Sequence, residues 1–267
     1  MFRPRVIPCL LLKEDGLVKT TAFENPRYIG DPLNAVRIFN EKQADELLFL
    51  NIMASKKRGF LGRAVKHAIP VEMVARISRE CLMPLTYGGG IRSIDDIRRL
   101  FSAGVEKVAI NTNGIANPAF IREASEIFGS QSIIVSIDAR RRSDGKYEVF
   151  THGGSQATGM DPADLAEKME AAGAGEIMIT SIDNDGSMAG YDIALTRKIA
   201  DLVSIPVIAC GGAGSLEDFR KGYCDGNASA IAAGSLFVYH GRKRAVLISY
   251  PTRSELEQTF AGVSESA

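Results

Sequence analysis

Neither sign of charge is in excess in this sequence, because 32 basic side chains balance 32 acidic ones over 267 residues. The chain therefore lacks the basic surplus that marks proteins binding nucleic acid or an anionic membrane surface. Long hydrophobic runs are also missing: no segment approaches a membrane span, and the apolar run near residue 10 is too short for a signal peptide. We therefore expect a cytoplasmic protein with no nucleic-acid or membrane partner.

Cysteine and histidine are scarce, at four and three residues. The cysteines, which are Cys9, Cys81, Cys210 and Cys224, show neither the spacing of a metal site nor that of a disulfide framework. The histidines, which are His67, His152 and His240, are scattered and equally lack ligand spacing. The sequence thus predicts reduced, buried cysteines, histidines with surface or core roles, and a protein without a metal or other cofactor.

Short β-type runs alternate with amphipathic helical patterns along the whole chain. The predicted strands cover residues 5–11, 46–52, 84–87, 107–111, 132–138, 176–182, 206–210 and 228–234, with helical patterns such as 34–44, 94–104, 163–174 and 195–203 between them. Continuous apolar strands joined by helices indicate a parallel sheet buried on both faces, and eight strands are the number in a closed barrel. We predict an α/β fold, a single (β/α)₈ TIM barrel over residues 1–267, with an open doubly wound sheet as the alternative.

The chain also repeats itself. "YGGGIRS" at 87–93 and "CGGAGS" at 210–215 align at an offset of 122 residues, which carries Asn111 onto Ala233 and Asn113 onto Ser235. Offsets of about this size also relate strand one to strand five and strand two to strand six. This pattern predicts an internal duplication, with half-barrels at about 1–128 and 129–250.

Glycine turns that follow barrel strands let backbone N–H groups approach an anion, and barrels commonly hold phosphate in this way. The candidate residues are Gly211, Gly212, Gly234 and Ser235 in the second half and Gly89, Gly90, Asn111 and Thr112 in the first. Two such turns on opposite sides of one mouth suit an elongated small molecule with a phosphate at each end. The alternative is that the glycines only form tight loops.

Several motifs together carry a family resemblance. "RVIPCL", "DELLFLNI", "YGGGI", "VAINT", "FGSQSIIVSIDAR", "GAGEIMITSIDNDG" and "IACGGAGS" resemble the cyclase (HisF-type) subunit of imidazole glycerol phosphate synthase, from about residue 4 to about residue 240. The resemblance implies that a HisH-like glutaminase subunit docks on the N-terminal face of the barrel. It also implies that ammonia crosses the barrel to a two-phosphate ribonucleotide at the C-terminal face, where the glycine turns hold the phosphates.

One catalytic group that the resemblance implies is missing. The family uses two aspartates, at the ends of strands one and five, to exchange protons with ammonia and the closing imidazole ring. Asp138 matches the second, but Leu11 stands at the first, on the strand face that should point inward, and leucine cannot transfer a proton. Asn51 replaces a further acid, and Cys210 replaces a serine.

The long connection 13–32 predicts a mobile functional lid. It contains Lys19, which matches a catalytic lysine of the family that contacts the substrate. Glu14 or Asp15 in the same connection is an alternative source of the missing acid, although a flexible side chain is poorly placed for proton transfer.

Charged residues at the opposite end of the barrel match the family's ammonia gate. They are Arg5, Glu46, Lys107 and Glu176, at the beginnings of strands one, two, four and six, where two charges of each sign can neutralise one another. The alternative is a set of solvated residues at strand starts.

Asp183 and Asp185 match family positions that contact the ligand, although a loop turn or helix cap would also explain them. Residues 140–150 predict a charged hairpin, and 239–260 predict a final helix capping the barrel.

These observations favour an enzyme subunit of the synthase (lyase) type in a two-component glutamine amidotransferase. Because Leu11 replaces the acid, the chain resembles the HisF paralogues associated with sugar amidation in surface-polysaccharide (lipopolysaccharide) biosynthesis, where the ammonia goes to a third protein, a sugar amidotransferase. The alternatives are a true cyclase subunit of histidine biosynthesis and a phosphosugar isomerase barrel, which would need no ammonia partner.

Overall fold

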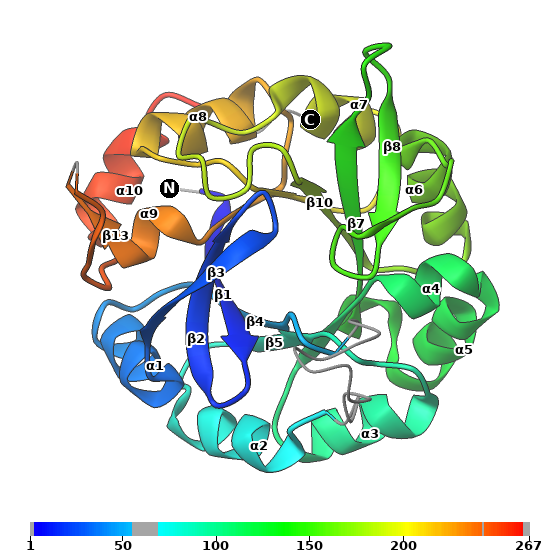
Figure 1. The fold of residues 1–267 in the computed structure, drawn as a ribbon, viewed down its shortest axis with the longest axis horizontal. Helices are drawn as coiled ribbons and strands as arrows, with labels where there is room; N and C mark the ends of the chain where they lie inside the picture. Colours follow the sequence, from blue (N-terminus) through cyan, green and yellow to red (C-terminus); the bar gives the residue numbers. More distant parts are fainter. Residues whose placement is uncertain (1–2, 55–68, 242, 264–267) are drawn as a thin grey trace.

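The computed structural model describes residues 3–54, 69–241 and 243–263. Within these residues, eight parallel strands form a closed barrel in which each strand pairs with the next and the last pairs with the first (Figure 1). They are β1 (Arg5–Lys13), β4 (Leu47–Asn51), β5 (Leu85–Gly88), β6 (Lys107–Ile110), β7 (Ile133–Arg141), β10 (Glu176–Ser181), β11 (Val207–Cys210) and β12 (Ala230–Ala233). Each coincides with a predicted strand, so the predicted (β/α)₈ barrel is confirmed.

Helices surround the barrel as an outer ring (Figure 1). They are α1 (Pro32–Glu41), α2 (Val71–Glu80), α3 (Ile94–Ser102), α5 (Pro118–Phe128), α6 (Pro162–Ala171), α7 (Ile193–Ala200), α8 (Leu216–Cys224) and α10 (Arg253–Thr259), with the short helices α4 (Thr112–Ala116) and α9 (Ser235–Val238) and a 3₁₀ turn at Ser130–Ser132. Each long helix is amphipathic and buries its apolar face against the strands, as covered parallel sheets require.

The residues that cap helix N-termini recur in the two halves of the chain, at the same spacing as the sequence repeat. Ser93 and Asp96 form a capping box at the start of α3, and Ser215 and Asp218 form the same box at the start of α8. Helices α1 and α6 share a second signal, an aspartate cap followed by proline. Each half also opens with a nine-residue strand, β1 or β7, that has an antiparallel partner. These matches support the repeat, while the boundary near residue 128 stays a prediction.

The connection 13–32 is a β-hairpin rather than the loop that the sequence predicted. It contains β2 (Gly16–Thr21), which pairs antiparallel with β1, and β3 (Glu24–Gly30), which pairs with β2. Leu17 and Val18 are buried and anchor the hairpin, and the role of this connection as a mobile lid stays a prediction. The charged hairpin predicted at 140–150 is confirmed, with β8 (Tyr147–Thr151) paired to the end of β7. The remaining short strands are β9 (Gln156–Ala157), β13 (Tyr239–His240) and β14 (Ala245–Val246).

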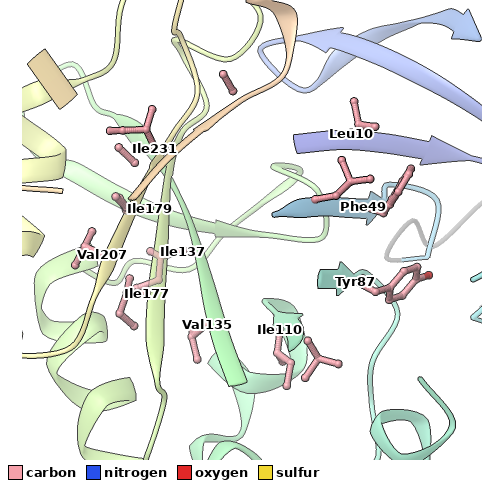
Figure 2. Close-up of a cluster of buried hydrophobic side chains, with 14 of the residues drawn as sticks. Leu10, Phe49, Tyr87, Ile110, Val135, Ile137, Ile177, Ile179, Val207 and Ile231 are labelled. Atoms are coloured by element: carbon pink, nitrogen blue, oxygen red, sulfur yellow. The ribbon is translucent and has the colours of Figure 1, made fainter. Parts of the chain in front are cut away.

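Buried apolar side chains form two layers because successive residues of a strand point to opposite faces. The larger layer lies between the barrel and the helices and includes Leu10, Phe49, Tyr87, Val135 and Ile177 (Figure 2). The smaller layer fills the barrel interior and consists of Ile7, Cys9, Leu48, Ala109, Ile134, Met178, Ile208, Ala230 and Ala232. The barrel is therefore a packed core and not an open pore.

The predicted final helix is α10, which packs against α8 in the outer ring. Arg220 of α8 donates to the carbonyl oxygen of Thr259 at 3.0 Å, and the Tyr250 hydroxyl donates to the carbonyl oxygen of Val6 at 2.9 Å. Helix α10 thereby lies at the side of the barrel and ties the C-terminal segment to the start of β1. Among the helices described, none is both long and apolar enough to cross a bilayer.

The four cysteines are all free thiols, as predicted. Their predicted burial holds for Cys9, whereas Cys81 and Cys210 are half-buried and Cys224 is exposed. The expectation for Cys224 was wrong because this residue ends α8 outside the buried face of that helix. His240 is exposed, in agreement with a surface role, and His67 lies outside the described residues.

Candidate functional site

A cavity of about 420 Å³ opens at the C-terminal ends of the barrel strands. This end of a parallel barrel is where TIM-barrel enzymes place their active sites. Both glycine turns contribute to its wall, and the predicted site residues among the lining are Leu11, Lys19, Gly89, Gly90, Asn111, Thr112, Asp138, Asp185, Gly211, Gly212, Gly234 and Ser235. The structure therefore brings together, around one space, residues that the sequence spreads over both halves.

The glycine turns need glycine for two separate reasons. Gly89 and Gly211 have positive φ angles of 102° and 89°, a conformation that other residues adopt at a cost. A Cβ at Gly89 would also lie 2.4 Å from the carbonyl oxygen of Asn51, and a Cβ at Gly211 would lie 2.7 Å from that of Ser181. The two turns are thus equivalent in backbone shape as well as in sequence.

Asp138 on β7 lines the cavity, with 9% of its surface exposed. Burial, with a smaller effect of the negative charge of Asp185, raises the pKa of Asp138 from 3.8 to about 7. Asn111 Nδ2 donates to the Ser136 carbonyl oxygen at 2.9 Å and to Asp138 Oδ2 at 3.2 Å. A carboxyl group held in this way can both accept and donate a proton near neutral pH.

Leu11 lines the same cavity, in agreement with the inward direction that strand alternation predicts. Asn51 also lines it, and Asn51 Nδ2 donates to the Tyr87 hydroxyl at 3.3 Å. Glu14 and Asp15 are exposed at the turn between β1 and β2 and do not line the cavity. Among the described residues, the carboxylates that line the cavity are those of Asp138 and Asp185.

Cys9 and Cys210 both line the cavity from inward-facing strand positions. The hydrogen bond that the Cys9 thiol donates to Cys210, together with burial, raises the pKa of Cys9 well above its usual range. Cys9 consequently stays protonated, which makes it a packing residue and a poor nucleophile.

Lys19 and Asp185 form an ion pair in which Nζ lies 2.7 Å from Oδ1. The second oxygen of Asp185 accepts from the Thr20 hydroxyl at 2.7 Å, and the backbone carbonyl of Asp185 accepts from Ala22 N at 2.8 Å. Asp185 thus fixes the β2–β3 hairpin beside the cavity. Asp183 lies apart from the cavity lining, because it accepts from Arg141 N at 2.9 Å and pairs with Arg140 at 3.3 Å.

His152 also lines the cavity, a position that the sequence did not predict. It follows β8, and its backbone N–H donates to Thr112 Oγ1 at 3.1 Å. The signal that could have identified it is its place just after the hairpin that extends β7, because this hairpin returns the chain to the barrel mouth. Spacing rules for metal ligands could not reveal such a position.

Four charged residues meet at the opposite end of the barrel. Arg5 lies 2.5 Å from both Glu46 and Glu176, and Lys107 lies 2.6 Å from Glu176 and 3.4 Å from Glu46. Each cation therefore contacts both carboxylates, which closes the set into a ring. Thr86 adds a hydrogen bond to Glu46 at 2.8 Å. We call Arg5, Glu46, Lys107 and Glu176 the charge ring.

Between the charge ring and the cavity lies the inner apolar layer. Strand β1 shows the sequence of layers, with Arg5 in the charge ring, Ile7 in the apolar layer and Leu11 in the cavity. Strand β10 repeats it, with Glu176 in the charge ring and Met178 in the apolar layer. Such a layer excludes ions but offers a much lower barrier to a small neutral molecule.

Comparison with known proteins gives consistent results over nearly the whole chain. A family model described as "Histidine biosynthesis protein" matches residues 5–243. "Putative imidazole glycerol phosphate synthase subunit hisF2" of Pseudomonas aeruginosa is 48% identical over 257 residues, which cover 96% of this chain and 99% of that protein. "Putative imidazole glycerol phosphate synthase subunit HisF" of Leptospira borgpetersenii is 47% identical and that of Leptospira interrogans 45%, each over 97% of this chain and 100% of its own length.

Proposed function

Because the chain belongs to the HisF-type family of imidazole glycerol phosphate synthase subunits, we propose that it is the synthase-type barrel of a two-component glutamine amidotransferase. A separate, HisH-like glutaminase docks on the N-terminal face and releases ammonia there. The ammonia passes the charge ring, crosses the barrel and reaches the cavity. The observation that carries this proposal is the pairing of a complete charge ring at one end with Leu11 at the other.

The charge ring contributes little to stability for the free energy that is needed to bury its carboxylates, so a purely structural role does not explain it well. Glu46 and Glu176 are 2% and 6% exposed, and buried ion pairs rarely stabilise a fold more than apolar residues of similar volume would. A ring of mutual ion pairs does, however, close the base of the barrel, and it can open when one ion pair breaks and its charged groups pair with other members of the ring. This supports a gate for ammonia at the base of the barrel.

The interior supports passage of ammonia rather than ammonium. Ammonium would have to lose its water shell to enter the layer of Ile7, Leu48 and Met178, whereas the desolvation cost of neutral ammonia is much smaller. Asp138 lies beyond this layer, and a carboxyl group with a pKa of about 7 can exchange protons with the arriving amine. Lys19 and Asp185 complete the polar side of the cavity and contact the bound molecule.

The glycine turns support a phosphorylated small molecule as the ligand of the cavity. One side of the cavity has Gly211 and Gly212 after β11 with Gly234 and Ser235 after the neighbouring β12. The other side has Gly89 and Gly90 after β5 with Asn111 and Thr112 after the neighbouring β6. Turns without side chains let backbone N–H groups approach phosphate oxygens closely. We assign these residues to phosphate contacts on that basis.

We further propose that the ammonia leaves the cavity for a third protein that amidates a surface-polysaccharide sugar. Ring closure to imidazole glycerol phosphate needs two acid–base groups, and Leu11 removes one of them. The competing function is the complete cyclase reaction of histidine biosynthesis. Asp138 favours that function, since one of the two acids is still present and has a pKa of about 7.

The test combines the purified chain with a HisH-type glutaminase. We expect the chain to form a complex and to stimulate glutamine hydrolysis, with release of ammonia but no imidazole product from the two-phosphate ribonucleotide. Formation of the imidazole product would establish the competing cyclase function. Absence of both complex and stimulation would overturn the amidotransferase role.

A further inference from the structure

Two thiols face each other where the inner apolar layer meets the cavity. Cys9 on β1 is 6% exposed and belongs to that layer, and Cys210 on β11 packs against the layer. Both residues also line the cavity. Because Cys9 donates a hydrogen bond to Cys210, the two sulfur atoms are turned toward one another. The proposed function gives this pair of thiols no role.

The strand between the two cysteines explains how their sulfur atoms meet. Strand β12 lies between β1 and β11, and its residues in the inner apolar layer are Ala230 and Ala232. Alternate strands of such a barrel contribute side chains to the same interior layer. Because alanine side chains are short, the thiols of Cys9 and Cys210 reach across β12 and come into contact.

The same arrangement disfavours a disulfide between Cys9 and Cys210. Two strand spacings of about 4.8 Å separate the backbones of β1 and β11, whereas a disulfide joins Cα atoms no more than about 7 Å apart. A metal ion bonded to both sulfur atoms spans a wider gap, because each metal–thiolate bond is about 2.3 Å long. The pair therefore fits a bridging ion better than a covalent bond between the sulfurs.

The number and kind of ligands decide the class of ion. Over the part of the chain that the structure describes, His, Cys, Asp and Glu form no group of three or more that could hold a metal ion. Two sulfur atoms consequently suit neither Zn²⁺, which prefers four ligands, nor Ca²⁺ and Mg²⁺, which prefer oxygen. Thiolate and thioether groups select Cu(I), and the inner apolar layer also contains the thioether of Met178.

Binding of Cu(I) to two thiols balances without a redox step. Each S–H bond is replaced by an S–Cu bond, two protons leave through the cavity, and copper stays Cu(I). Because a coordinating thiol is deprotonated outright, the raised pKa of Cys9 lowers the affinity but does not prevent binding. The positive charge of Lys19 favours a thiolate at Cys9, and the smaller effect of Asp185 opposes it.

We propose that Cys9 and Cys210 form a binding site for a single Cu(I) ion, held by both sulfur atoms where the inner apolar layer meets the cavity. The ion enters from the mouth, because Cys210 is half-buried and lines the cavity. The site depends only on the two thiols and not on the proposed amidotransferase function. If that function holds, a bound ion lies where the ammonia route enters the cavity.

Anaerobic competition with the Cu(I) chelator bicinchoninate measures the affinity of the full chain. We expect one tightly bound Cu(I), and Cys9→Ala and Cys210→Ala should each weaken it about 100-fold, because a second ligand on the same molecule adds that much or more. Equal affinities of the wild type and a folded Cys210→Ala variant would overturn the proposal, whether or not Cys9→Ala folds.

The two remaining free thiols provide matched controls. Cys81 donates to the Met83 carbonyl oxygen at 3.2 Å, and Cys224 is exposed at the end of α8. Cys81→Ala and Cys224→Ala should therefore keep the Cu(I) affinity within about twofold, since neither removes a member of the pair. A loss in either control as large as that in Cys210→Ala, with the variants folded by circular dichroism, would contradict the assignment.

Two further measurements test the ligands and the class of ion without a glutaminase. X-ray absorption at the copper edge of the loaded chain should show sulfur neighbours, and a shell of nitrogen or oxygen atoms would contradict the site. Zn²⁺ is the counter-probe, and Cys210→Ala should change its affinity less than about twofold, because two thiols do not complete a zinc site. A zinc affinity that falls together with the Cu(I) affinity would overturn the proposed class of ion.

Discussion

Arg5 on β1 and Glu176 on β10 form an ion pair of 2.5 Å across the base of the barrel, although they are 171 residues apart in the sequence. Lys107 and Glu46 complete the ring around the same axis. Such an arrangement requires four different strands to begin at one level. The closed barrel provides that register, and the charge ring is therefore a product of the whole fold and not of a local motif.

Arg5→Ala should uncouple the barrel from its glutaminase. The substitution leaves Glu46 and Glu176 sharing one cation, and we expect a loss of about 2–4 kcal/mol in the free energy of unfolding. Stimulation of glutamine hydrolysis should fall, while methyl phosphate affinity should be unchanged. Arg3→Ala is the control, because Arg3 forms an ion pair with Asp45 outside the charge ring. Altered phosphate affinity with normal stimulation would count against a gate.

Leu11→Asp should create or raise ammonia-dependent turnover of the two-phosphate ribonucleotide. The new carboxylate would face the cavity that Asp138 already lines and would restore a pair of acid–base groups. Leu11→Asn is the control, because it adds polarity without a titratable group. If the aspartate variant gains nothing over the asparagine variant, differences elsewhere in the site, such as Asn51 and Cys210, must also block the reaction.

Asp138 should make stability depend on pH. Because burial raises its pKa to about 7 from 3.8, its stabilisation is fully present below pH 3.8 and is lost as the pH rises through about 7. Asp138→Asn removes this titration, so the variant should gain about 2–3 kcal/mol relative to the wild type between roughly pH 5 and pH 8. Urea unfolding at both pH values measures the difference, with the exposed Asp144→Asn as control. If the difference in unfolding free energy between wild type and Asp138→Asn is the same at both pH values, Asp138 ionises with its ordinary pKa.

Gly212→Ala should be costly to the fold as well as to the site. Gly212 has a φ of 114°, and a Cβ there would lie 2.1 Å from the carbonyl oxygen of Gly190. We expect a loss of more than about 2 kcal/mol in the free energy of unfolding, since strain and a backbone clash add. Gly145→Ala has a similar φ of 82° but open space around its Cβ, and it should cost only about 1 kcal/mol. If both variants lose a similar free energy of unfolding, the backbone around position 212 has moved to relieve the contact with Gly190.

Strand periodicity predicted the barrel because parallel strands buried on both faces leave a clear signal. The eight apolar runs and the repeated glycine turns were sufficient for the topology, and alternation along β1 correctly directed Leu11 inward. The β2–β3 hairpin was missed because its exposed strand, which includes Arg27 and Tyr28, has no apolar alternation. Its ordering comes from contacts with Asp185, which is distant in the sequence.

The candidate site was predictable only in part. Family motifs indicated Lys19, Asp138 and the glycine turns, and all of them line one cavity. The direction of Asn111 toward Asp138 and the unpaired hydroxyl of Ser235 depend on rotamers that no sequence pattern encodes. His152 was missed for a related reason, since only the return of the β7–β8 hairpin brings it to the mouth.

The most direct test of the proposed function is turnover of the two-phosphate cyclase substrate by the purified chain, with saturating ammonium salt and no glutaminase. This measurement bypasses the ammonia route and examines only the chemistry at the C-terminal face. Because Leu11 lines the cavity and cannot transfer a proton, we expect no imidazole product above the uncatalysed background. Robust turnover would contradict it and would assign the chain to the ring-closing step of histidine biosynthesis.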